Sequence, residues 1–406
     1  MRIVQINLTY NIGSTGHIMA DLHQVIQSSR NESYMVCGYS NIKNVEHLHV
    51  MQTLPAIWDM RKDLLISRLT GRMGYNSQRE TRKLVSWLEG IRPDIVHLHN
   101  IHGNYLHLGI LFAYLKKADL PVVWTLHDCW TFTGRCSHFE LHGCDQWKTG
   151  CQRCNQKDIY PITYLFDFSK SMWKDKKELF TGLANAQLVT PSAWLKQYVD
   201  QSYLNKYDCS VINNGINLNT FYPCKKRSHY LEGDSRKVIL GVTSSWTARK
   251  GLYDFYKLDA MIDHEKYRIV LVGLNERQMK ELPASILGIR RTNNVQELVE
   301  LYSSADVYVN PTYQDNYPTV NLEAAACGTP VVTYRTGGSP ESVPAEVGLV
   351  VERGDIGQLY NSIMKILSEE KNAECRSAYA KKHFDKNQKY EEYLECYRQL
   401  MKRAKE

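Results

Sequence analysis

Residues 310–342 read NPTYQDNYPTVNLEAAACGTPVVTYRTGGSPES and carry the strongest pattern in the chain. An apolar run at residues 307–309 predicts a strand before this segment; a polar loop, a helix of small residues and a strand at 330–334 follow. Asp315 and Glu323 stand eight residues apart, across the loop and the helix start. Amides at a helix N-terminus lack partners within the helix and bind phosphate or sugar oxygens. Amides flanked by two acids therefore predict a pocket for a nucleotide sugar.

The composition is that of an ordinary globular protein. The chain has 406 residues, 43% hydrophobic and 23% charged, with a formal net charge of +7. This length favours two domains. No run of about 18 apolar residues predicts a transmembrane helix, and the first residues, MRIVQINL, alternate like a buried strand and do not resemble a signal peptide. Eleven cysteines, several scattered among helix and strand patterns, suit a reducing cytoplasm. The modest charge demands no acidic partner, and we expect no nucleic acid.

Short apolar runs alternate with helical stretches along both halves, as a doubly wound parallel sheet requires. The expected strands are 2–7, 34–38, 95–99, 122–127, 187–191 and 209–213 in the first half, and 237–242, 268–273, 307–310, 331–334 and 348–351 in the second. The stretch 217–236 is rich in turn and charged residues. We therefore expect a first domain at 1–218, a second at 219–386 and a closing helix within 387–406.

The segment QDNYPTVNLEAAACGTPVV resembles the donor site of retaining glycosyltransferases of family four. Their signature is two glutamates separated by seven residues, with an LEAxAxGxPVV-like helix and strand; here Asp315 replaces the first glutamate. The resemblance implies the GT-B fold: two Rossmann-like domains facing across a cleft, with a C-terminal helix that crosses back to the first domain. It also implies transfer from a nucleoside-diphosphate sugar, of UDP or GDP, without a metal or cofactor for catalysis.

The same resemblance assigns roles in the second domain. Glu323 is expected to hold the ribose hydroxyls and Asp315 the donor sugar. Lys250, in TSSWTARKGL, matches the family's Lys-Gly pattern and is expected to neutralise the diphosphate. Ser245 stands where the family has an arginine, so Arg249 is the nearest substitute cation. The other expected donor contacts are Arg291, Asn316, Tyr317, Pro318 and Thr319.

Two features of the first domain complete the expected site. Gly13 and Gly16 follow the first strand, let the backbone approach an oxyanion, and precede a helix expected to open at His17. The G-x-G-x-x-G spacing is not met, which argues against a nicotinamide enzyme. His127 ends a strand in VVWTLHD, where family members carry a histidine near the donor sugar and acceptor. By resemblance His127 joins Lys250 and Asp315 as catalytic; the alternative is a histidine that only satisfies a loop carbonyl.

Four cysteines lie within nineteen residues: Cys136, Cys144, Cys151 and Cys154. The last two have the C-x2-C spacing of a zinc knuckle, and the other thiols would complete a tetrahedral set. Such a site would be structural, because four thiolates leave no open coordination position. Two disulfides and unligated thiols are the alternatives.

Residues 61–83 are rich in arginine and lysine, with leucines interleaved. Such a helix can lie on an anionic membrane surface or can be a solvated helix packed on its domain. We expect a retaining hexosyltransferase that extends a saccharide, carried on a polyprenyl diphosphate, in surface polysaccharide biosynthesis. Its expected place is the cytoplasm, at the inner face of the membrane. A nucleotide-sugar 2-epimerase of the same fold is the alternative, but no acid pair for it stands out in the first domain; a non-catalytic sensor is a third reading.

Overall fold

A computed structural model of the chain describes residues 1–40, 50–52, 57–157, 160–370 and 372–404. The chain forms two compact units, one of Met1–Asn213 with Tyr390–Glu406 and the other of Asn214–Lys389. The predicted domain boundaries, after residues 218 and 386, stay predictions. The chain passes from the first compact unit to the second after Asn213 and returns to the first after Lys389.

The first unit contains a parallel sheet of seven strands in the order β3-β2-β1-β4-β5-β6-β7. The strands are β1 (Arg2–Tyr10), β2 (Glu32–Ser40), β3 (Val50–Gln52), β4 (Ile95–Leu98), β5 (Val122–Thr125), β6 (Ala186–Thr190) and β7 (Asp208–Val211). Strand β1 pairs with β2 on one side and with β4 on the other. The chain therefore turns back at β1 and builds the rest of the sheet outward in the other direction, as in Rossmann folds.

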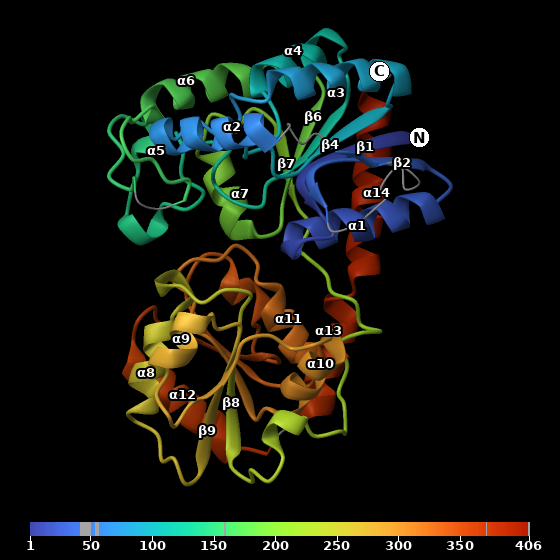
Figure 1. Cartoon of the computed structure of the whole chain (residues 1–406). Coiled ribbons are helices and arrows are strands. Elements are labelled where there is room, and N and C mark those ends of the chain that lie inside the picture. The colour runs from blue at the N-terminus through green and yellow to red at the C-terminus, as the bar shows by residue number, and fades with distance from the viewer. Residues whose placement is uncertain (41–49, 53–56, 158–159, 371, 405–406) are drawn as a thin grey trace. The chain divides into compact units, whose positions relative to one another are not determined.

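Helices cover both faces of this sheet. They are α1 (Gly13–Ser28), α2 (Ile57–Thr70), α3 (Gln78–Ile91), α4 (Leu108–Lys117), α5 (Gln146–Thr149), α6 (Ser169–Phe180) and α7 (Ala193–Asp200). Leu84 of α3, Phe112 of α4 and Phe180 of α6 share one core with β-strand side chains such as Trp124. Figure 1 shows these three helices together along one face. Burial on both faces explains why strands such as β5 (VVWT) are continuously apolar.

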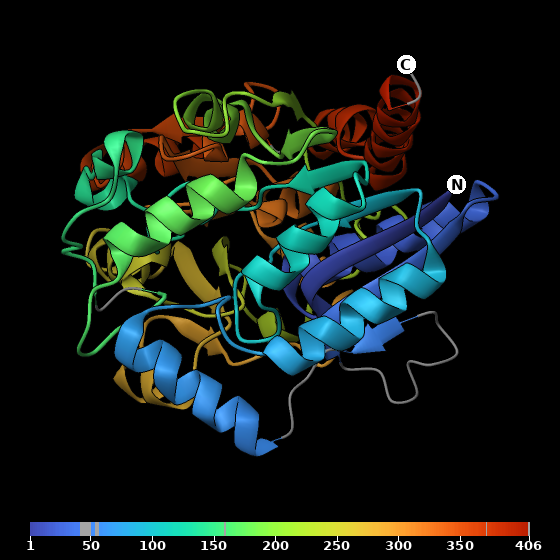
Figure 2. The same cartoon turned by 90° about the horizontal axis from the view of Figure 1, so that it is seen from above.

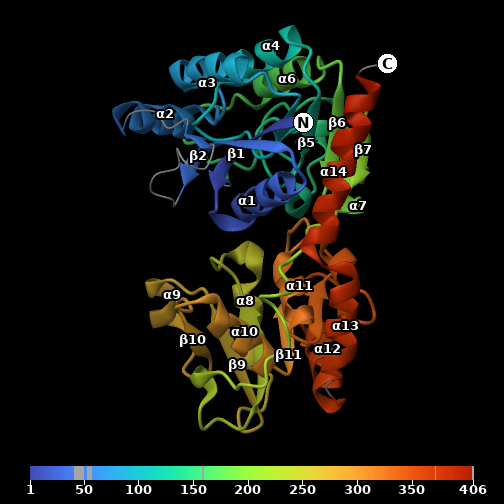
Figure 3. The same ribbon diagram turned by 90° about the vertical axis from the view of Figure 1, so that its right-hand side faces the viewer.

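The last helix, α14 (Lys386–Arg403), packs on the opposite face of the first sheet (Figure 3). Its buried residues recur at helical spacing and form one stripe: Tyr390, Tyr393, Leu394, Tyr397 and Leu400. This stripe contacts Ile3, Ile95 and Val123 of the sheet and the inner face of α1. The expected return of the C-terminal helix to the first unit is thus part of the fold.

The second unit contains a parallel sheet of six strands in the order β10-β9-β8-β11-β12-β13. Its strands are β8 (Lys237–Val242), β9 (Tyr267–Val272), β10 (Leu287–Ile289), β11 (Val307–Asn310), β12 (Val331–Tyr334) and β13 (Gly348–Val351). Its helices are α8 (Leu252–Asp259), α9 (Glu276–Glu281), α10 (Val295–Ser304), α11 (Thr319–Ala326), α12 (Ile356–Ser368) and α13 (Ala373–His383). Alternate strand residues point to opposite faces, so Tyr308 joins the core under α10 and α11, whereas Val307 and Val309 join the core under α8 and α12.

The structure confirms the fold class and corrects details of the expected elements. Strands β8, β11, β12 and β13 have the predicted bounds, whereas β3 and β10 were not predicted. Both are three-residue edge strands, too short for a period to be visible. The expected helix start at His17 is wrong, because α1 opens at Gly13. Among the described helices, none combines the length and the apolar character needed to cross a bilayer.

Candidate active site

The second unit places its two predicted motifs at one edge of the sheet. Strand β8 pairs with both β9 and β11, so the direction of strand addition reverses between β8 and β11. In open parallel sheets, ligands bind beyond the carboxyl ends of strands at such a reversal. The loops that leave these two ends are residues 243–251 and 311–318.

Lys250 and Asp315, both predicted to be catalytic, contact each other. The Lys250 Nζ lies 2.5 Å from Asp315 Oδ2, and the side chains are 20% and 21% exposed. The other carboxylate oxygen of Asp315 accepts a hydrogen bond from the main-chain N–H of Asn316 at 2.9 Å. A partly exposed ion pair of this kind can exchange partners when an anion arrives, because water already reaches both groups. The structure therefore joins one cation and one anion at the edge of the sheet.

Arg249 is tied to the same loop. Its guanidinium Nη1 donates to the Gln314 carbonyl at 2.5 Å, and its own carbonyl accepts from the Tyr313 N–H at 2.7 Å. These bonds join the loops after β8 and β11. Ser245, in contrast, is exposed, and its N–H lies 3.5 Å from the Thr243 hydroxyl. Arg249 thus holds the loops together, and its role as a cation for the donor stays a prediction.

Glu323 lies on α11. The hydroxyl of Tyr302, on α10, donates a hydrogen bond to Glu323 Oε2 at 3.1 Å. Removal from water raises the pKa of this carboxyl to about 7, although hydrogen bonds from Tyr302 and Thr319 act in the opposite direction. A carboxyl with this pKa changes its charge near neutral pH. The predicted donor residues Glu323 and Thr319 therefore contact each other on the first turns of α11.

The other predicted donor residues of this unit differ in how far their side chains are exposed to solvent. Asn316 and Tyr317 are buried, and the Tyr317 ring belongs to the core under α11. Pro318 is the N-cap of α11 and makes no side-chain cap. The contacts that this segment can offer an anion are therefore main-chain amides of the first turn. Arg291 is exposed in the loop after β10.

A polar network under α11 was missed at the sequence level. The buried Asn321 amide accepts from Asn310 Nδ2 at 2.8 Å and donates to the hydroxyls of Ser339 and Ser342 at 3.2 and 2.9 Å. These residues join the end of β11, the helix and the segment after β12. An asparagine between the apolar residues Val320 and Leu322 was the available signal, since a buried amide needs partners.

In the first unit, Gly13 and Gly16 lie in the first turn of α1, whose N-cap residue Ile12 makes no side-chain cap. A Cβ at Gly16 would lie 2.9 Å from Thr9 Oγ1, so helix and strand approach each other closely here. Gly13 has a positive φ of 64°, and a Cβ added there would meet nothing within 4 Å. Close packing of helix and strand therefore explains why residue 16 is a glycine, and the positive φ explains why residue 13 is one.

His127 follows β5 at the carboxyl edge of the first sheet. Its Nε2 lies 3.2 Å from Nδ1 of His99, and the two rings are stacked with centroids 5.4 Å apart. Burial lowers the pKa of His127 to about 4, so the ring is neutral at pH 7. His97 lies against His99 with ring centroids 4.0 Å apart and is held by the Tyr397 and Thr125 hydroxyls at 2.7 and 2.8 Å.

Asp128, the next residue, pairs with a different histidine. Its Oδ2 lies 3.1 Å from His102 Nε2, and its Oδ1 accepts from the Trp130 N–H at 2.8 Å. Burial alone would raise the pKa of Asp128, but the His102 contact and the Trp130 N–H lower it to about 2. The Tyr160 hydroxyl lies 3.3 Å from the other nitrogen of His102. The carboxyl edge of this sheet thus holds an ionised aspartate beside neutral His127.

Comparisons with known proteins show the family of the chain. A family model described as "Glycosyltransferase Family 4" matches residues 63–220, and one described as "Glycosyl transferases group 1" matches residues 226–383. A protein of Escherichia coli K12 named as the colanic acid biosynthesis glycosyl transferase WcaC is 24% identical over 98% of this chain and all of its own length. The chain belongs to the family-four type of GT-B glycosyltransferases.

Solved structures share the fold of this glycosyltransferase. Sucrose-phosphate synthase from Thermosynechococcus elongatus has a TM-score of 0.72 at 17% identity, over 98% of this chain and 99% of its own. Anabaena HepE, solved in complex with UDP-glucose, has a TM-score of 0.65 at 17% identity, over 98% of this chain and all of its own. The relatives WcaC and, in Staphylococcus aureus, CapM are named for polysaccharide biosynthesis, and this glycosyltransferase is of that type. These findings do not favour the 2-epimerase.

The cysteine-rich loop of the glycosyltransferase keeps its thiols near one another. Burial raises the pKa of Cys136 to about 12, and the charges of Cys154, Cys151 and Cys144 act in the same direction. The Gly134 N–H donates to Cys151 Sγ at 3.0 Å. In the part of the chain that the structure describes, no three or more His, Cys, Asp or Glu side chains are placed to hold a metal ion. All four cysteines are free, and structural zinc stays a prediction.

Proposed function

We propose that the chain transfers a glycosyl residue, with retention of anomeric configuration and without a catalytic metal, from a UDP- or GDP-sugar to a saccharide carried on a lipid. The observation that carries this proposal is the arrangement of Lys250, Asp315 and Glu323 where strand order reverses in the second unit. A cation for a diphosphate and acids for two sets of hydroxyls are what a nucleotide sugar requires.

Each of the three side chains has a role in binding the donor. Ionised Glu323 accepts hydrogen bonds from the two ribose hydroxyls. Lys250 exchanges its bond to Asp315 for the diphosphate, and Asp315 then accepts from hydroxyls of the donor sugar. Amides of the first turn of α11 supply further donors to the phosphate oxygens. The Lys250–Asp315 pair thus balances its own two charges until the donor separates it.

The transfer forms one bond and breaks another at the anomeric carbon. The acceptor hydroxyl oxygen bonds to this carbon from the face that the diphosphate leaves, and the hydroxyl proton passes to the departing phosphate oxygen. Negative charge grows on the diphosphate as the bond breaks, and Lys250 stabilises it. The reaction needs no covalent intermediate on the protein.

Two relatives support the choice of donor and acceptor. Anabaena HepE is solved with UDP and with UDP-glucose. A Campylobacter jejuni relative, 27% identical over 48% of this chain and 55% of its own length, is named as a transferase acting on a sugar linked to diphospho-undecaprenol. We propose the same classes of substrate here, and reaction at the cytoplasmic face of a membrane.

Nucleotide binding is expected to strengthen as the pH rises from 6 to 8. With a pKa of about 7, Glu323 is mostly protonated at pH 6 and mostly ionised at pH 8. Only the ionised carboxylate accepts both ribose hydroxyls, so affinity should rise about tenfold over this interval. Titration calorimetry with UDP and GDP at several pH values measures this change, and thermal shifts with the same nucleotides show which base is bound.

The variant Glu323→Gln is the control for this pH dependence. It keeps the shape of the side chain but cannot ionise, so it should retain only the weak pH dependence that the nucleotide phosphate contributes. Glu323→Ala should abolish the thermal shift. Full nucleotide binding by Glu323→Ala, or identical pH profiles for wild type and Glu323→Gln, would rule out the ribose role.

An exposed apolar surface supports the proposed membrane contact. The segment 163–166 runs beside the end of α2: the N–H groups of Tyr164 and Phe166 donate to the carbonyls of Arg68 and Leu69 at 2.7 and 2.9 Å. Together the two segments expose large side chains, which we call the apolar patch: Leu64, Leu65, Tyr164, Leu165 and Phe166. Figure 2 shows α2 at the periphery of the first unit. Contiguous exposed apolar side chains of this size mark interaction surfaces.

Basic residues next to the apolar patch favour an anionic bilayer as the partner. Arg61, Lys62 and Arg68 are exposed on the same helix as Leu64 and Leu65. Apolar and aromatic side chains that enter the interface, with cations that meet lipid headgroups, are the features of membrane-surface segments. An acceptor carried on a lipid would be reached from such a position.

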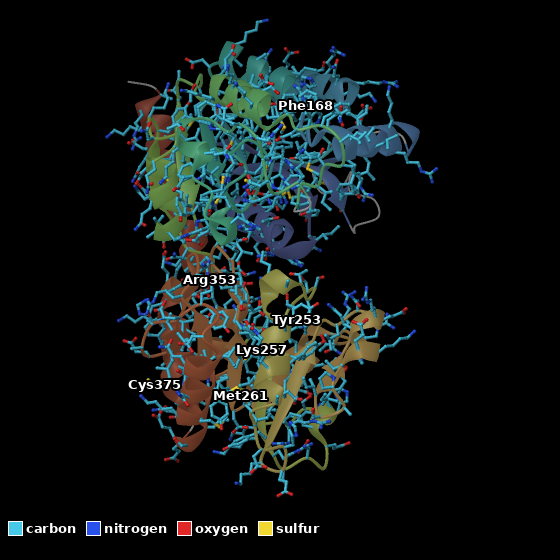
Figure 4. All side chains as sticks on the ribbon, turned by 90° about the vertical axis from the view of Figure 1, so that its left-hand side faces the viewer. Phe168, Tyr253, Lys257, Met261, Arg353 and Cys375 are labelled. Carbon is cyan, nitrogen blue, oxygen red and sulfur yellow. The ribbon has the colours of Figure 1, made fainter. Side chains whose placement is uncertain are left out.

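The double variant Leu165→Asp, Phe166→Asp is expected to bind vesicles at least about tenfold more weakly, since each large apolar side chain contributes about 1.5–3 kcal/mol when buried. Cosedimentation with vesicles of equal parts phosphatidylglycerol and phosphatidylcholine measures this. Tyr253→Asp on α8 (Figure 4) is the control, because Tyr253 is 62% exposed and Leu165 63%. Two results would exclude the membrane role. One is equal vesicle binding by the double variant and wild type; the other is a wild-type protein that is dimeric in solution while the double variant is monomeric.

A further inference from the structure

Tyr160 ends a hydrogen-bonded chain of three side chains at the carboxyl edge of the first sheet. His102 lies in the loop after β4 and Asp128 in the loop after β5, and these strands are neighbours. His102 Nε2 lies 3.1 Å from Asp128 Oδ2, and the Tyr160 hydroxyl lies 3.3 Å from His102 Nδ1. In open parallel sheets, the loops at this edge surround the ligand. The chain of side chains therefore lies where a substrate of the first unit would bind.

The chemistry of this chain fixes the direction of the Tyr160 hydroxyl. With a pKa of about 2, Asp128 is an ionised carboxylate that can only accept, so His102 Nε2 carries a proton. In a neutral His102 ring, Nδ1 then accepts the Tyr160 proton; in a charged ring, Nδ1 donates to the Tyr160 oxygen. Both charge states keep the contact. The hydroxyl of Tyr160 is thus directed toward His102 in either state.

Tyr160 exposes its ring although its hydroxyl is buried. His102 is only 6% exposed and packs against the rings of Trp130 and Tyr160, with centroids 5.4 and 6.0 Å away. Burial of the hydroxyl raises the pKa of Tyr160 to about 12, whereas 46% of the residue's surface is exposed. The exposed surface is therefore mainly that of the ring. This reverses the usual arrangement, in which a tyrosine buries its ring and keeps its hydroxyl in water.

We propose that a sugar ring of the acceptor stacks on the exposed face of Tyr160, and that His102 and Asp128 are positioning residues that fix this face. The inference rests on the proposed function for the acceptor being a saccharide. The faces of a pyranose carry C–H groups that pack against an aromatic ring, and a ring already held in one orientation loses little entropy on binding. The negative face of an aromatic ring does not attract phosphate. The Tyr160 ring therefore suits the saccharide part of the acceptor and not its diphosphate.

The alternative role for Tyr160 is to hold the segment that carries the apolar patch. That segment is already tied to the end of α2 by other bonds. The Thr163 hydroxyl donates to the Leu69 carbonyl at 3.1 Å, and the Tyr164 N–H donates to the Arg68 carbonyl at 2.7 Å. Because these bonds hold the segment beside the patch, the contact of Tyr160 with His102 is not needed to keep the patch in place.

Saturation-transfer difference NMR with the methyl glycosides of glucose, galactose and N-acetylglucosamine tests the stacking. We expect wild-type protein to transfer saturation to the ring C–H protons of at least one glycoside at millimolar concentration. Tyr160→Leu should weaken this binding about fivefold, the usual contribution of an aromatic contact, and Tyr160→Phe, which keeps the ring, should weaken it less. Equal binding by wild type and Tyr160→Leu, or no binding of any glycoside by wild type, would overturn the proposal.

Variants of His102 test the positioning role. His102→Leu removes both hydrogen bonds and should weaken glycoside binding as Tyr160→Leu does, while the thermal shift with UDP or GDP stays unchanged. His102→Gln can still bond to both neighbours and should restore binding. Tyr222→Leu is the matched control, because Tyr222 is 41% exposed but belongs to the second unit, and it should bind glycosides as wild type does. Wild-type glycoside binding by His102→Leu would rule out positioning by His102.

The remaining outcomes distinguish this inference from the two roles proposed above. Tyr160→Leu should bind vesicles as wild type does; a loss as large as that of Leu165→Asp, Phe166→Asp would mean that Tyr160 holds the apolar patch, and would overturn the proposal. If nucleotides fail to bind while Tyr160→Leu loses glycoside binding, the donor assignment fails and the saccharide subsite stands. If nucleotides bind and Tyr160→Leu keeps glycoside binding, the subsite fails and the donor site stands.

Discussion

Lys250→Ala is expected to lower kcat/KM for the glycosyl donor by about 100- to 1,000-fold, the usual cost of removing one preorganised group that stabilises charge in a transition state. Lys250 is bonded to Asp315 at 2.5 Å, so the variant loses the cation for the diphosphate and also leaves Asp315 without this partner. The Asp315 carboxylate, no longer offset by the Lys250 ammonium, then repels the incoming diphosphate. Steady-state transfer assays with the donor that the nucleotide panel identifies measure the loss.

Lys257→Ala is the matched control for this variant. Lys257 lies on α8, labelled in Figure 4, and its Nζ is 3.3 Å from Asp254 Oδ1, so it too is a lysine paired with an aspartate. It points to no predicted donor residue and should have wild-type kinetics. If Lys250→Ala retained more than a tenth of wild-type kcat/KM, another group would have to neutralise the diphosphate.

Gly337→Ala is expected to abolish measurable donor binding and to destabilise the second unit by about 2 kcal/mol, as overpacked and strained positions do. Gly337 has a φ of 55°, and a Cβ there would lie 1.8 Å from the Asp315 carbonyl oxygen. The chain must move, and the hydrogen bond from the Gly338 N–H to the same carbonyl, at 3.2 Å, is lost with the position of Asp315. Thermal unfolding and nucleotide titration measure the two effects.

Gly233→Ala separates backbone strain from the collision. Gly233 also has a positive φ, of 74°, but nothing lies within 4 Å of the added Cβ. This variant should lose only about 1 kcal/mol of stability and keep its nucleotide affinity. Equal effects of the two substitutions would mean that the turn after β12 does not position Asp315.

The sequence predicted the strands correctly where the apolar runs are long enough to be recognised. Buried parallel strands such as β8 (KVILGV) and β11 (VYVN) are rich in apolar residues, and their bounds were predicted correctly. The three-residue strands β3 and β10 carry no such pattern. The start of α1 was placed too late, because Gly13 and Gly16 are poor helix formers that nevertheless lie in its first turn.

The candidate site was predictable as a set of residues but not as a set of contacts. Spacing along the chain drew attention to Lys250 and Asp315 separately, yet it could not show that they pair across two loops. The bond of Arg249 to Gln314 is equally non-local. The contact between His99 and His127 has no motif either, since it depends on which strands are neighbours in the sheet. Long-range pairing is decided by topology, which a local pattern does not contain.

The return of α14 to the first unit has a consequence for how the protein is made. Its tyrosine and leucine stripe covers Ile3, Ile95 and Val123, which leave the ribosome long before it does. Domains fold as they emerge, from the N-terminal end. The nascent first unit must therefore persist with part of a sheet face open to water while the whole second unit is translated. Such a surface attracts chaperones and neighbouring nascent chains, and translation of α14 is the event that closes it.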